Sequence, residues 1–158
     1  GLADAHLRAA AQAAGVAPQR LVFAAKQAHP AYLARYRHDD LLLDTGPYNA
    51  HTTASDALWA GCPVLTTPGR TFASRVAGSL NHHLGLDGMN LPDDDAFVAR
   101  AISLGNAPDA LAALRAELAA RRRTGSLFDM DGFAKDFADA AHTMANRHRQ
   151  GLPPASFG

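Results

Sequence analysis

The sequence predicts an α/β protein with a small parallel β-sheet, helices on both faces of that sheet, and a helical segment after it. Short apolar runs over Arg20–Ala24, Asp40–Asp44 and Pro63–Thr67 have the length and composition of strands. Helical patterns separate these runs, and such alternation indicates parallel pairing. Three leucines in succession, Leu41–Leu43, favour a strand that is covered on both faces.

Helices are expected between and after the strands. Gly15 and Gly61 follow two of the helical patterns and are typical helix stops. In the helix predicted over Phe72–Leu84, Val76 and Leu80 have the spacing of an inward face. The other predicted helices are Leu2–Ala14, Pro30–Arg37, a helix that opens at Thr52 or Thr53, one that opens at Asp93–Asp95, Asp109–Arg123, and Met130–His148 with a stripe of Phe133, Phe137 and Met144.

Length and composition limit the class of protein. A chain of 158 residues can bury one core, so residues 1–149 are assigned to one folded part and residues 150–158 to a loose tail. The 15 basic and 15 acidic residues balance, which favours neither nucleic acid nor an anionic membrane as a partner. The single Cys62 permits no internal disulfide, and no apolar run reaches the roughly 20 residues of a membrane span. We therefore expect a cytoplasmic protein.

The stretch from Leu41 to Thr67 contains the strongest functional signal. A strand leads through a turn of Gly, Pro and Asn into a helix, which places free backbone N–H groups at the carboxyl edge of the sheet. Thr52 or Thr53 can cap this helix, and Asp56 is expected in its first turn. These residues fit two interpretations equally well: a capped helix without a ligand, or a site in which His51 and the two threonines hold a diphosphate and Asp56 a ribose.

Two polar clusters have simpler explanations. The neighbouring His82 and His83 point about 100° apart on a helix and have no third ligand at a suitable spacing. Asp93, Asp94 and Asp95 stand at a helix start, where carboxylates are favoured, and no loop of oxygen ligands follows them. No metal site is predicted.

The segment from Leu43 to Leu86 closely resembles the C-terminal catalytic region of the O-linked N-acetylglucosaminyltransferases of glycosyltransferase family 41, including bacterial and SPINDLY-like members. The similarity runs from about Leu7 to about Phe137. The matching residues are Asp44-Thr45, Tyr48-Asn49, His51-Thr52-Thr53, Asp56, Leu58-Trp59-Ala60-Gly61, Pro63-Val64-Leu65, Pro68-Gly69 and Ala73-Ser74-Arg75-Val76.

This resemblance implies half of the C-terminal Rossmann-like domain of a GT-B glycosyltransferase. It implies an enzyme that transfers N-acetylglucosamine from UDP-N-acetylglucosamine (UDP-GlcNAc) to Ser or Thr of an acceptor protein with inversion and without a metal or other cofactor. Because Gly1 leads straight into a helix without an initiating Met, a preceding catalytic domain and helical repeats are expected as partners. The isolated chain is expected to bind UDP weakly and to transfer nothing.

The resemblance also implies roles for individual residues. Thr52 and Thr53 would hold the phosphates, His51 would lie near the β-phosphate and the sugar, and Asp56 would bind the ribose. The family's uracil-binding groups fall on Gln27 or Ala28, His29, Tyr32 and Arg35.

Three positions depart from the family pattern. The family often has Lys at the position of His29 and His at that of Tyr32, so the expected charged contact with uracil weakens whereas ring stacking remains possible. The family commonly has an acidic residue at Arg70, and the cation here either adds to phosphate binding or faces solvent.

No residue of this chain is a convincing general base, and two other functions stay open. One is a nucleotide-binding module without catalysis, for which the sequence upstream of Gly1 is the discriminator. The other is a different GT-B enzyme, such as a sugar-nucleotide epimerase, which would place acidic residues in the crevice.

Overall fold

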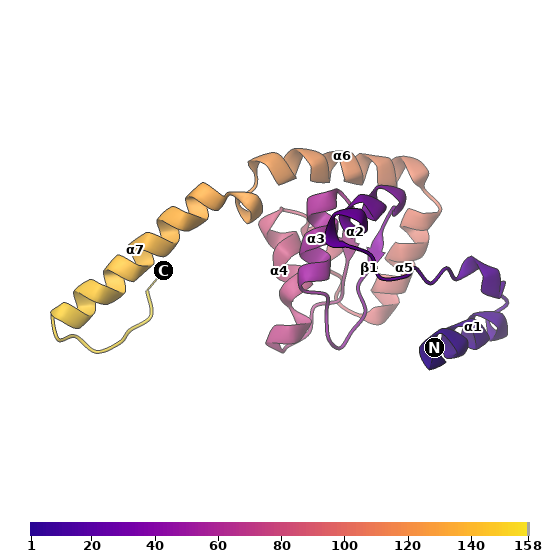
Figure 1. Ribbon diagram of the computed structural model, residues 1–158, viewed down its shortest axis with the longest axis horizontal. Coiled ribbons are helices and arrows are strands. Elements are labelled where there is room, and N and C mark those ends of the chain that lie inside the picture. The colour runs from indigo at the N-terminus through magenta and orange to yellow at the C-terminus, as the bar shows by residue number, and fades with distance from the viewer. Residues whose placement is uncertain (158) are drawn as a thin grey trace. The chain divides into compact units, whose positions relative to one another are not determined.

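The computed structural model describes residues 1–157 and divides the chain into two compact units. The first unit comprises Gly1–Tyr32, and the second begins at Leu33. Each unit is described here by itself, and Figure 1 gives the elements of both.

The first unit contains a helix and an extended segment. Helix α1 covers Leu2–Ala13, and Gly15 follows it with φ of 76°, which confirms the predicted stop. A 3₁₀ turn, η1, covers Pro18–Arg20, and helix α2 starts at His29 and ends at Arg35 in the second unit.

The strand predicted over Arg20–Ala24 is wrong for the described structure. After η1 the backbone is extended, but it joins no ladder among residues 1–157. Val22 is 85% exposed, and the ring of Phe23 is covered by the guanidinium of Arg8, which lies 4.9 Å from the ring centroid. The segment has the composition of a strand, but a strand also needs a neighbour for its backbone N–H and C=O groups.

The second unit carries the parallel sheet. Strand β1 covers Leu42–Leu43 and strand β2 covers Val64–Leu65, with Leu42 opposite Val64 and Leu43 opposite Leu65. Both lie inside predicted strands. A parallel bridge between Thr66 and Asn90 extends the pairing beyond β2. Leu43 is 48% exposed, so the prediction of a strand covered on both faces is wrong at this residue.

Helices make up most of the second unit, and their ends follow local signals. Gly61 ends α3 with φ of 89°, and the Asp93 side chain caps α5 by accepting a 2.8 Å hydrogen bond from the Ala96 amide. The elements after α2 are η2 Tyr36–His38, α3 Thr52–Ala60, η3 Phe72–Ser74, α4 Val76–His83, η4 Asp87–Met89, α5 Asp94–Gly105, α6 Pro108–Thr124, η5 Ser126–Phe128 and α7 Met130–Arg149.

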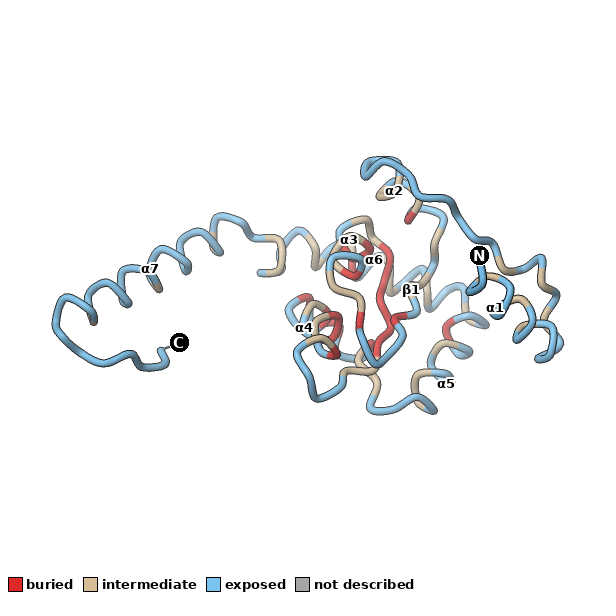
Figure 2. Tube along the Cα trace, turned by 60° about the horizontal axis from the view of Figure 1, so that its bottom comes forward, coloured by how far each residue is buried: buried red, intermediate tan, exposed pale blue. Residues whose placement is uncertain are grey.

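Buried residues gather on β2, α3 and α4. Figure 2 shows the buried parts of α3 and α4. The buried face of α4 differs from the prediction: Val76 and Leu80 are only half-buried, whereas Ala77, Gly78 and Asn81 are buried. Gly78 accounts for this difference, because a Cβ there would lie 2.6 Å from Cγ of Pro68. The missing side chain lets the loop after β2 pack directly on the helix.

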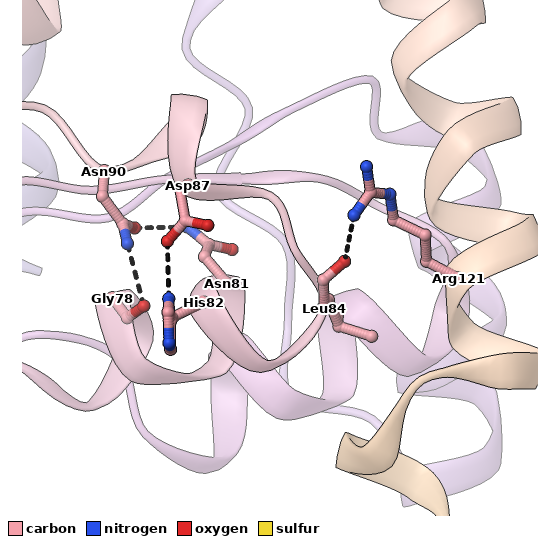
Figure 3. Close-up of polar contacts among 7 residues, drawn as sticks. All are labelled: Gly78, Asn81, His82, Leu84, Asp87, Asn90 and Arg121. Atoms are coloured by element: carbon pink, nitrogen blue, oxygen red, sulfur yellow. Dashed lines mark hydrogen bonds and ion pairs between the residues drawn. The ribbon is translucent and has the colours of Figure 1, made fainter.

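Asn81 and Asn90 join α4 to the sheet through side-chain amides. Nδ2 of Asn81 donates to the carbonyl oxygen of Val64 at 3.0 Å and to Oδ1 of Asn90 at 2.9 Å. Asn90 in turn donates to the carbonyl oxygen of Gly78 at 2.9 Å. Figure 3 shows the contacts of Asn90 with Asn81 and Gly78 beside the His82–Asp87 pair, whose Nδ1 and Oδ1 atoms are 2.7 Å apart. This network fixes α4 against β2 and against the segment around Asn90.

The last helix presents an uncovered apolar stripe. Phe133, Phe137 and Met144 of α7 are 62%, 66% and 54% exposed, and most of α7 is coloured as exposed in Figure 2. The rings of Phe133 and Phe137 stack with centroids 6.1 Å apart. The stripe predicted from the sequence is therefore present on α7, and it lies exposed in the structure.

None of the helices among residues 1–157 combines the length and the apolar character that crossing a lipid bilayer requires.

Candidate functional site

The candidate site is the loop between β1 and α3, and Asp44 holds its two ends. Asp44 directly follows β1 and is 6% exposed. Its Oδ1 accepts a 2.7 Å hydrogen bond from the amide of Ala50, and its Oδ2 accepts one of 2.7 Å from Oγ1 of Thr66, beyond β2. The carboxylate therefore ties the residue before His51 to the carboxyl edge of the sheet.

A second segment, residues 69–74, supports the loop from the other side. The carbonyl oxygen of Ala73 accepts from the backbone amide of Asn49 at 3.0 Å and lies 3.2 Å from Nε2 of His51. Within this segment, Oγ of Ser74 accepts from the amide of Thr71 at 3.1 Å, and the carbonyl oxygen of Ser74 accepts from the amide of Gly69 at 2.7 Å. These bonds fix the position of the Ala73 carbonyl.

Two exposed aromatic side chains flank His51. The ring of Tyr48 stacks on His51 with centroids 4.9 Å apart and planes 20° apart. The ring of Phe72 meets His51 edge-on at 5.9 Å and 83°. Tyr48 is 69% exposed and Phe72 is 78% exposed, so only the inner side of each ring is covered. The imidazole is thus held in one orientation by two rings and one carbonyl group.

Helix α3 begins without a side-chain cap, which corrects two predictions. The N-cap residue is His51, and its side chain makes no capping hydrogen bond. The threonine hydroxyls therefore do not cap the helix, and Asp56 lies beyond the first turn. The hydrogen bonds of Asp44 and of the Ala73 carbonyl explain this start, because they fix His51 at φ of −104° and ψ of −96°. Thr52 is therefore the first helical residue. The first amides of a helix lack partners within the helix, and a ligand can supply them.

An open groove of about 640 Å³ lies over this helix start. It brings together three of the predicted residues, His51, Thr52 and Thr53, and the two threonines are exposed. The full lining is Leu42, Leu43, Asp44, Thr45, Tyr48, Asn49, Ala50, His51, Thr52 and Thr53. Hydroxyls, an imidazole and unpaired amides in one concave site are suited to an anionic, hydrogen-bonding ligand.

The other predicted residues lie outside the lining of this groove. Gln27, His29 and Tyr32 belong to the first unit, where Gln27 and His29 are exposed and the His29 and Tyr32 rings stack with centroids 6.1 Å apart. Arg35, at the end of α2, and Asp56, within α3, are half-buried in the second unit.

Sequence reasoning did not assign a role to Asp44, Tyr48, Asn49 or Phe72. Three of them line the groove, and Phe72 contacts His51. Asn49 is 1% exposed, and its side-chain oxygen and nitrogen have no hydrogen-bond partner among the described residues. The available signal was position, because Asp44 directly follows the strand and Tyr48 and Asn49 stand next to His51. Arg70 is exposed.

Cys62 and the histidine pair add no chemistry to the site. Burial raises the pKa of the Cys62 thiol to about 11, with a further contribution from the negative charge of Asp39, so the reactive thiolate is disfavoured. His82 is paired with Asp87. Among residues 1–157, no group of three or more His, Cys, Asp and Glu side chains is placed to hold a metal ion.

Comparisons with known proteins show what this chain is similar to. Residues 2–137 match the family model described as Glycosyl transferase family 41. Over 150 residues, the chain is 34% identical to the UDP-N-acetylglucosamine–peptide N-acetylglucosaminyltransferase of Caenorhabditis elegans, covering 95% of this chain and 13% of that protein. It is 36% identical over 155 residues to the probable enzyme of the same name, SEC, of Arabidopsis thaliana, covering 98% of this chain and 16% of that protein.

A solved structure shows the same fold. A mutant of the Thermobaculum terrenum O-GlcNAc transferase superposes with a TM-score of 0.81 at 33% identity, covering 90% of this chain and 28% of the other. This likeness confirms the predicted fold class, an α/β part of a GT-B protein with a small parallel sheet and a helical tail. The chain spans only a small share of the length of these relatives.

Proposed function

Because the chain belongs to glycosyl transferase family 41, we propose that it forms the donor-binding part of an inverting protein O-GlcNAc transferase. The whole enzyme would transfer N-acetylglucosamine from UDP-GlcNAc to Ser or Thr side chains of proteins. The observation that carries this proposal is the uncapped start of α3, which opens with Thr52 and Thr53 into a groove of about 640 Å³. The names of the relatives supply the donor and the peptide acceptor.

The first turn of α3 would bind the diphosphate. Its unpaired amides and the hydroxyls of Thr52 and Thr53 are donors, and the positive end of the helix dipole favours an anion there. As the glycosidic bond breaks, negative charge grows on the leaving UDP, and fixed donors at that point stabilise it. We propose that these donors take the part that a divalent cation plays elsewhere, so that no metal or other cofactor is needed.

His51 would contact the donor through Nδ1. A carbonyl oxygen can only accept a hydrogen bond, so in the neutral imidazole the proton sits on Nε2, which faces Ala73. Nδ1 then carries a lone pair and suits an O–H or N–H group of the sugar. Only the doubly protonated ring would donate to the β-phosphate. The Ala73 carbonyl therefore decides which part of the donor His51 recognises.

The nucleoside would contact residues outside the groove lining. We propose that Asp56 accepts hydrogen bonds from the ribose and that Gln27, His29, Tyr32 and Arg35 surround the uracil. Tyr32 would supply a stacking face, and a neutral His29 would supply a hydrogen bond in place of a charge.

Transfer would require more than this chain. We assign no residue here as the general base, and we propose that a further catalytic domain and helical repeats of the same protein supply the base and bind the acceptor. The small share of the relatives' length that this chain spans supports that division of labour. A cytoplasmic location stays a prediction.

Titration of the intact protein with UDP and with UDP-GlcNAc tests the proposal. Thr53→Ala and Asp56→Ala should each weaken binding by about tenfold, because each removes a hydrogen bond to a charged or polar part of the ligand. Thr143→Ala and Asp95→Ala change the same residue types at exposed sites in α7 and α5 and should leave affinity unchanged.

Equal affinity of the parent, Thr53→Ala and Asp56→Ala would contradict the assignment. Release of UDP in the presence of a Ser/Thr-containing acceptor peptide then tests transfer. Tight UDP binding without any transfer by the intact protein would favour a non-catalytic nucleotide-binding module.

A further inference from the structure

The buried carboxylate of Asp44 makes hydrogen bonds that its position at the end of β1 does not require. Its backbone amide already pairs with the carbonyl oxygen of Leu65 at 2.9 Å, which satisfies the ladder. The side chain adds two further bonds of 2.7 Å, one to the Ala50 amide and one to the Thr66 hydroxyl. Hydrogen bonds to an ionised carboxylate are short and stronger than neutral ones.

We propose that Asp44 is the positioning residue of the donor site. It acts through the Ala50 amide, which precedes the N-cap residue His51, and it fixes where the first amides of α3 point. This proposal rests on the proposed function, because it concerns the same groove. Asp44 does not touch the donor in this scheme; its hydrogen bonds hold the groups that do.

The geometry explains why a carboxyl or amide group is needed at this position. One oxygen must accept from a backbone amide that has no other acceptor, and the second atom must bond with the Thr66 hydroxyl. A hydroxyl can donate or accept, so Asn can replace Asp, with Oδ1 on Ala50 and Nδ2 donating to Thr66. Ala can do neither, and it leaves the part-buried Ala50 amide and the buried Thr66 hydroxyl unpaired.

The charge of Asp44 gives the proposal a distinct signature. Among residues 1–157, no cation forms an ion pair with Asp44, and its negative charge lies next to the loop that would receive a diphosphate. Like charges repel across a partly buried site. Asp44→Asn should therefore keep the loop and bind UDP as tightly as the parent or more tightly, with a weaker dependence on salt.

Two measurements on the intact protein test this role. The first is the dissociation constant of UDP, measured by calorimetry at low temperature. The second is hydrogen exchange of the peptide that covers Ala50–Thr53, which needs no ligand. Leu118→Ala serves as the control, because Leu118 is a fully buried residue of α6 and its loss weakens the core without removing a bond of the loop.

The expected results separate positioning from general stability. Asp44→Ala should weaken UDP binding by at least about tenfold and accelerate exchange in the loop, whereas Thr66→Val, which removes only one bond, should cause a smaller change of both. Asp44→Asn should retain parental affinity or exceed it. Leu118→Ala should leave both the affinity and the loop exchange as in the parent.

Several results would overturn the proposal. One is an unchanged rate of loop exchange in both Asp44→Ala and Thr66→Val. Another is an Asp44→Asn variant that binds UDP as weakly as Asp44→Ala. The third is an equal loss of UDP affinity in Leu118→Ala and Asp44→Ala. Should the parent fail to bind UDP, the proposed function fails, but loop exchange still decides whether Asp44 holds the loop. If Asp44→Ala does not fold, the UDP affinity and loop exchange of Asp44→Asn and Thr66→Val test the proposal instead.

Discussion

The Asn81 network gives the sharpest prediction about what holds the second unit together. Asn81 is fully buried in α4, and its Nδ2 donates to the carbonyl oxygen of Val64 in β2. The same Nδ2 donates to Oδ1 of Asn90, as Figure 3 shows. Asn81→Ala removes both hydrogen bonds and leaves a small cavity. Each bond contributes about 1 kcal/mol net, and the cavity costs about 1 kcal/mol more, so the unit should lose about 3 kcal/mol.

Native-state hydrogen exchange in the intact protein measures this loss locally. Amides of β2 and α4 should exchange roughly 100-fold faster in Asn81→Ala, because every 1.4 kcal/mol is about tenfold in an opening equilibrium. Asn81→Leu restores volume but not the two bonds, so it should lie between the parent and the alanine variant. Asn106→Ala, which removes an exposed amide bonded to the Ile102 carbonyl, should change the opening free energy by no more than about 0.5 kcal/mol.

Parental exchange rates in Asn81→Leu would refute the reasoning. They would show that the two hydrogen bonds contribute nothing beyond the space that the side chain fills. The Oδ1 atom of Asn81 is buried without a partner among residues 1–157, so the leucine variant also gains by removing an unsatisfied oxygen. The predicted order of stability is the parent first, Asn81→Leu second and Asn81→Ala last. This order requires that the loss of the two hydrogen bonds outweighs the gain from removing the unsatisfied oxygen.

Two other predictions follow from the same packing. Gly69→Ala should weaken UDP binding and lower the stability of the second unit by about 1–3 kcal/mol, because the new Cβ would lie 2.5 Å from Oγ of Ser74. Gly88→Ala is the control, because a Cβ at Gly88 meets open space. Equal effects of the two substitutions would contradict the steric argument. The pKa of Cys62 is about 11 in the folded state, above the ordinary 9.0, so its contribution to stability is full below pH 9 and is lost as the pH rises through 11. The unfolding free energy of the parent should therefore fall more steeply between pH 9 and 11 than that of Cys62→Ala, and parallel curves would rule out this contribution.

Local signals predicted the elements whose ends are determined locally. Gly61 and Asp93 define helix boundaries through their own backbone or side chain, so their spacing in the sequence was sufficient. The strand at Arg20–Ala24 failed for the opposite reason, because a strand exists only when another strand pairs with it. The inward face of α4 failed because the loop around Pro68 packs against Gly78, a contact between residues in different elements.

The position of the helix start at the candidate site was predicted, but the contacts that build it were not. The residues His51, Thr52 and Thr53 were correctly placed at a helix start on the sheet edge, since strand, turn and helix follow one another in the chain. The absence of a threonine cap could not be predicted, because the backbone of His51 is fixed by Asp44 and Ala73. These residues lie 7 and 22 positions away in the sequence, and propensities carry no such information.

Residues 69–74 lie well after Thr52 and Thr53 in the sequence, yet they support the same candidate site. The Ala73 carbonyl holds both the Asn49 amide and the His51 imidazole, and Ser74 and Gly69 hold the turn that carries that carbonyl. A change at Gly69 or Ser74 would therefore act on His51 without touching a ligand. In the proposed donor site the same carbonyl selects the His51 tautomer, so we expect such a change to alter both the group that His51 recognises and the affinity for the ligand.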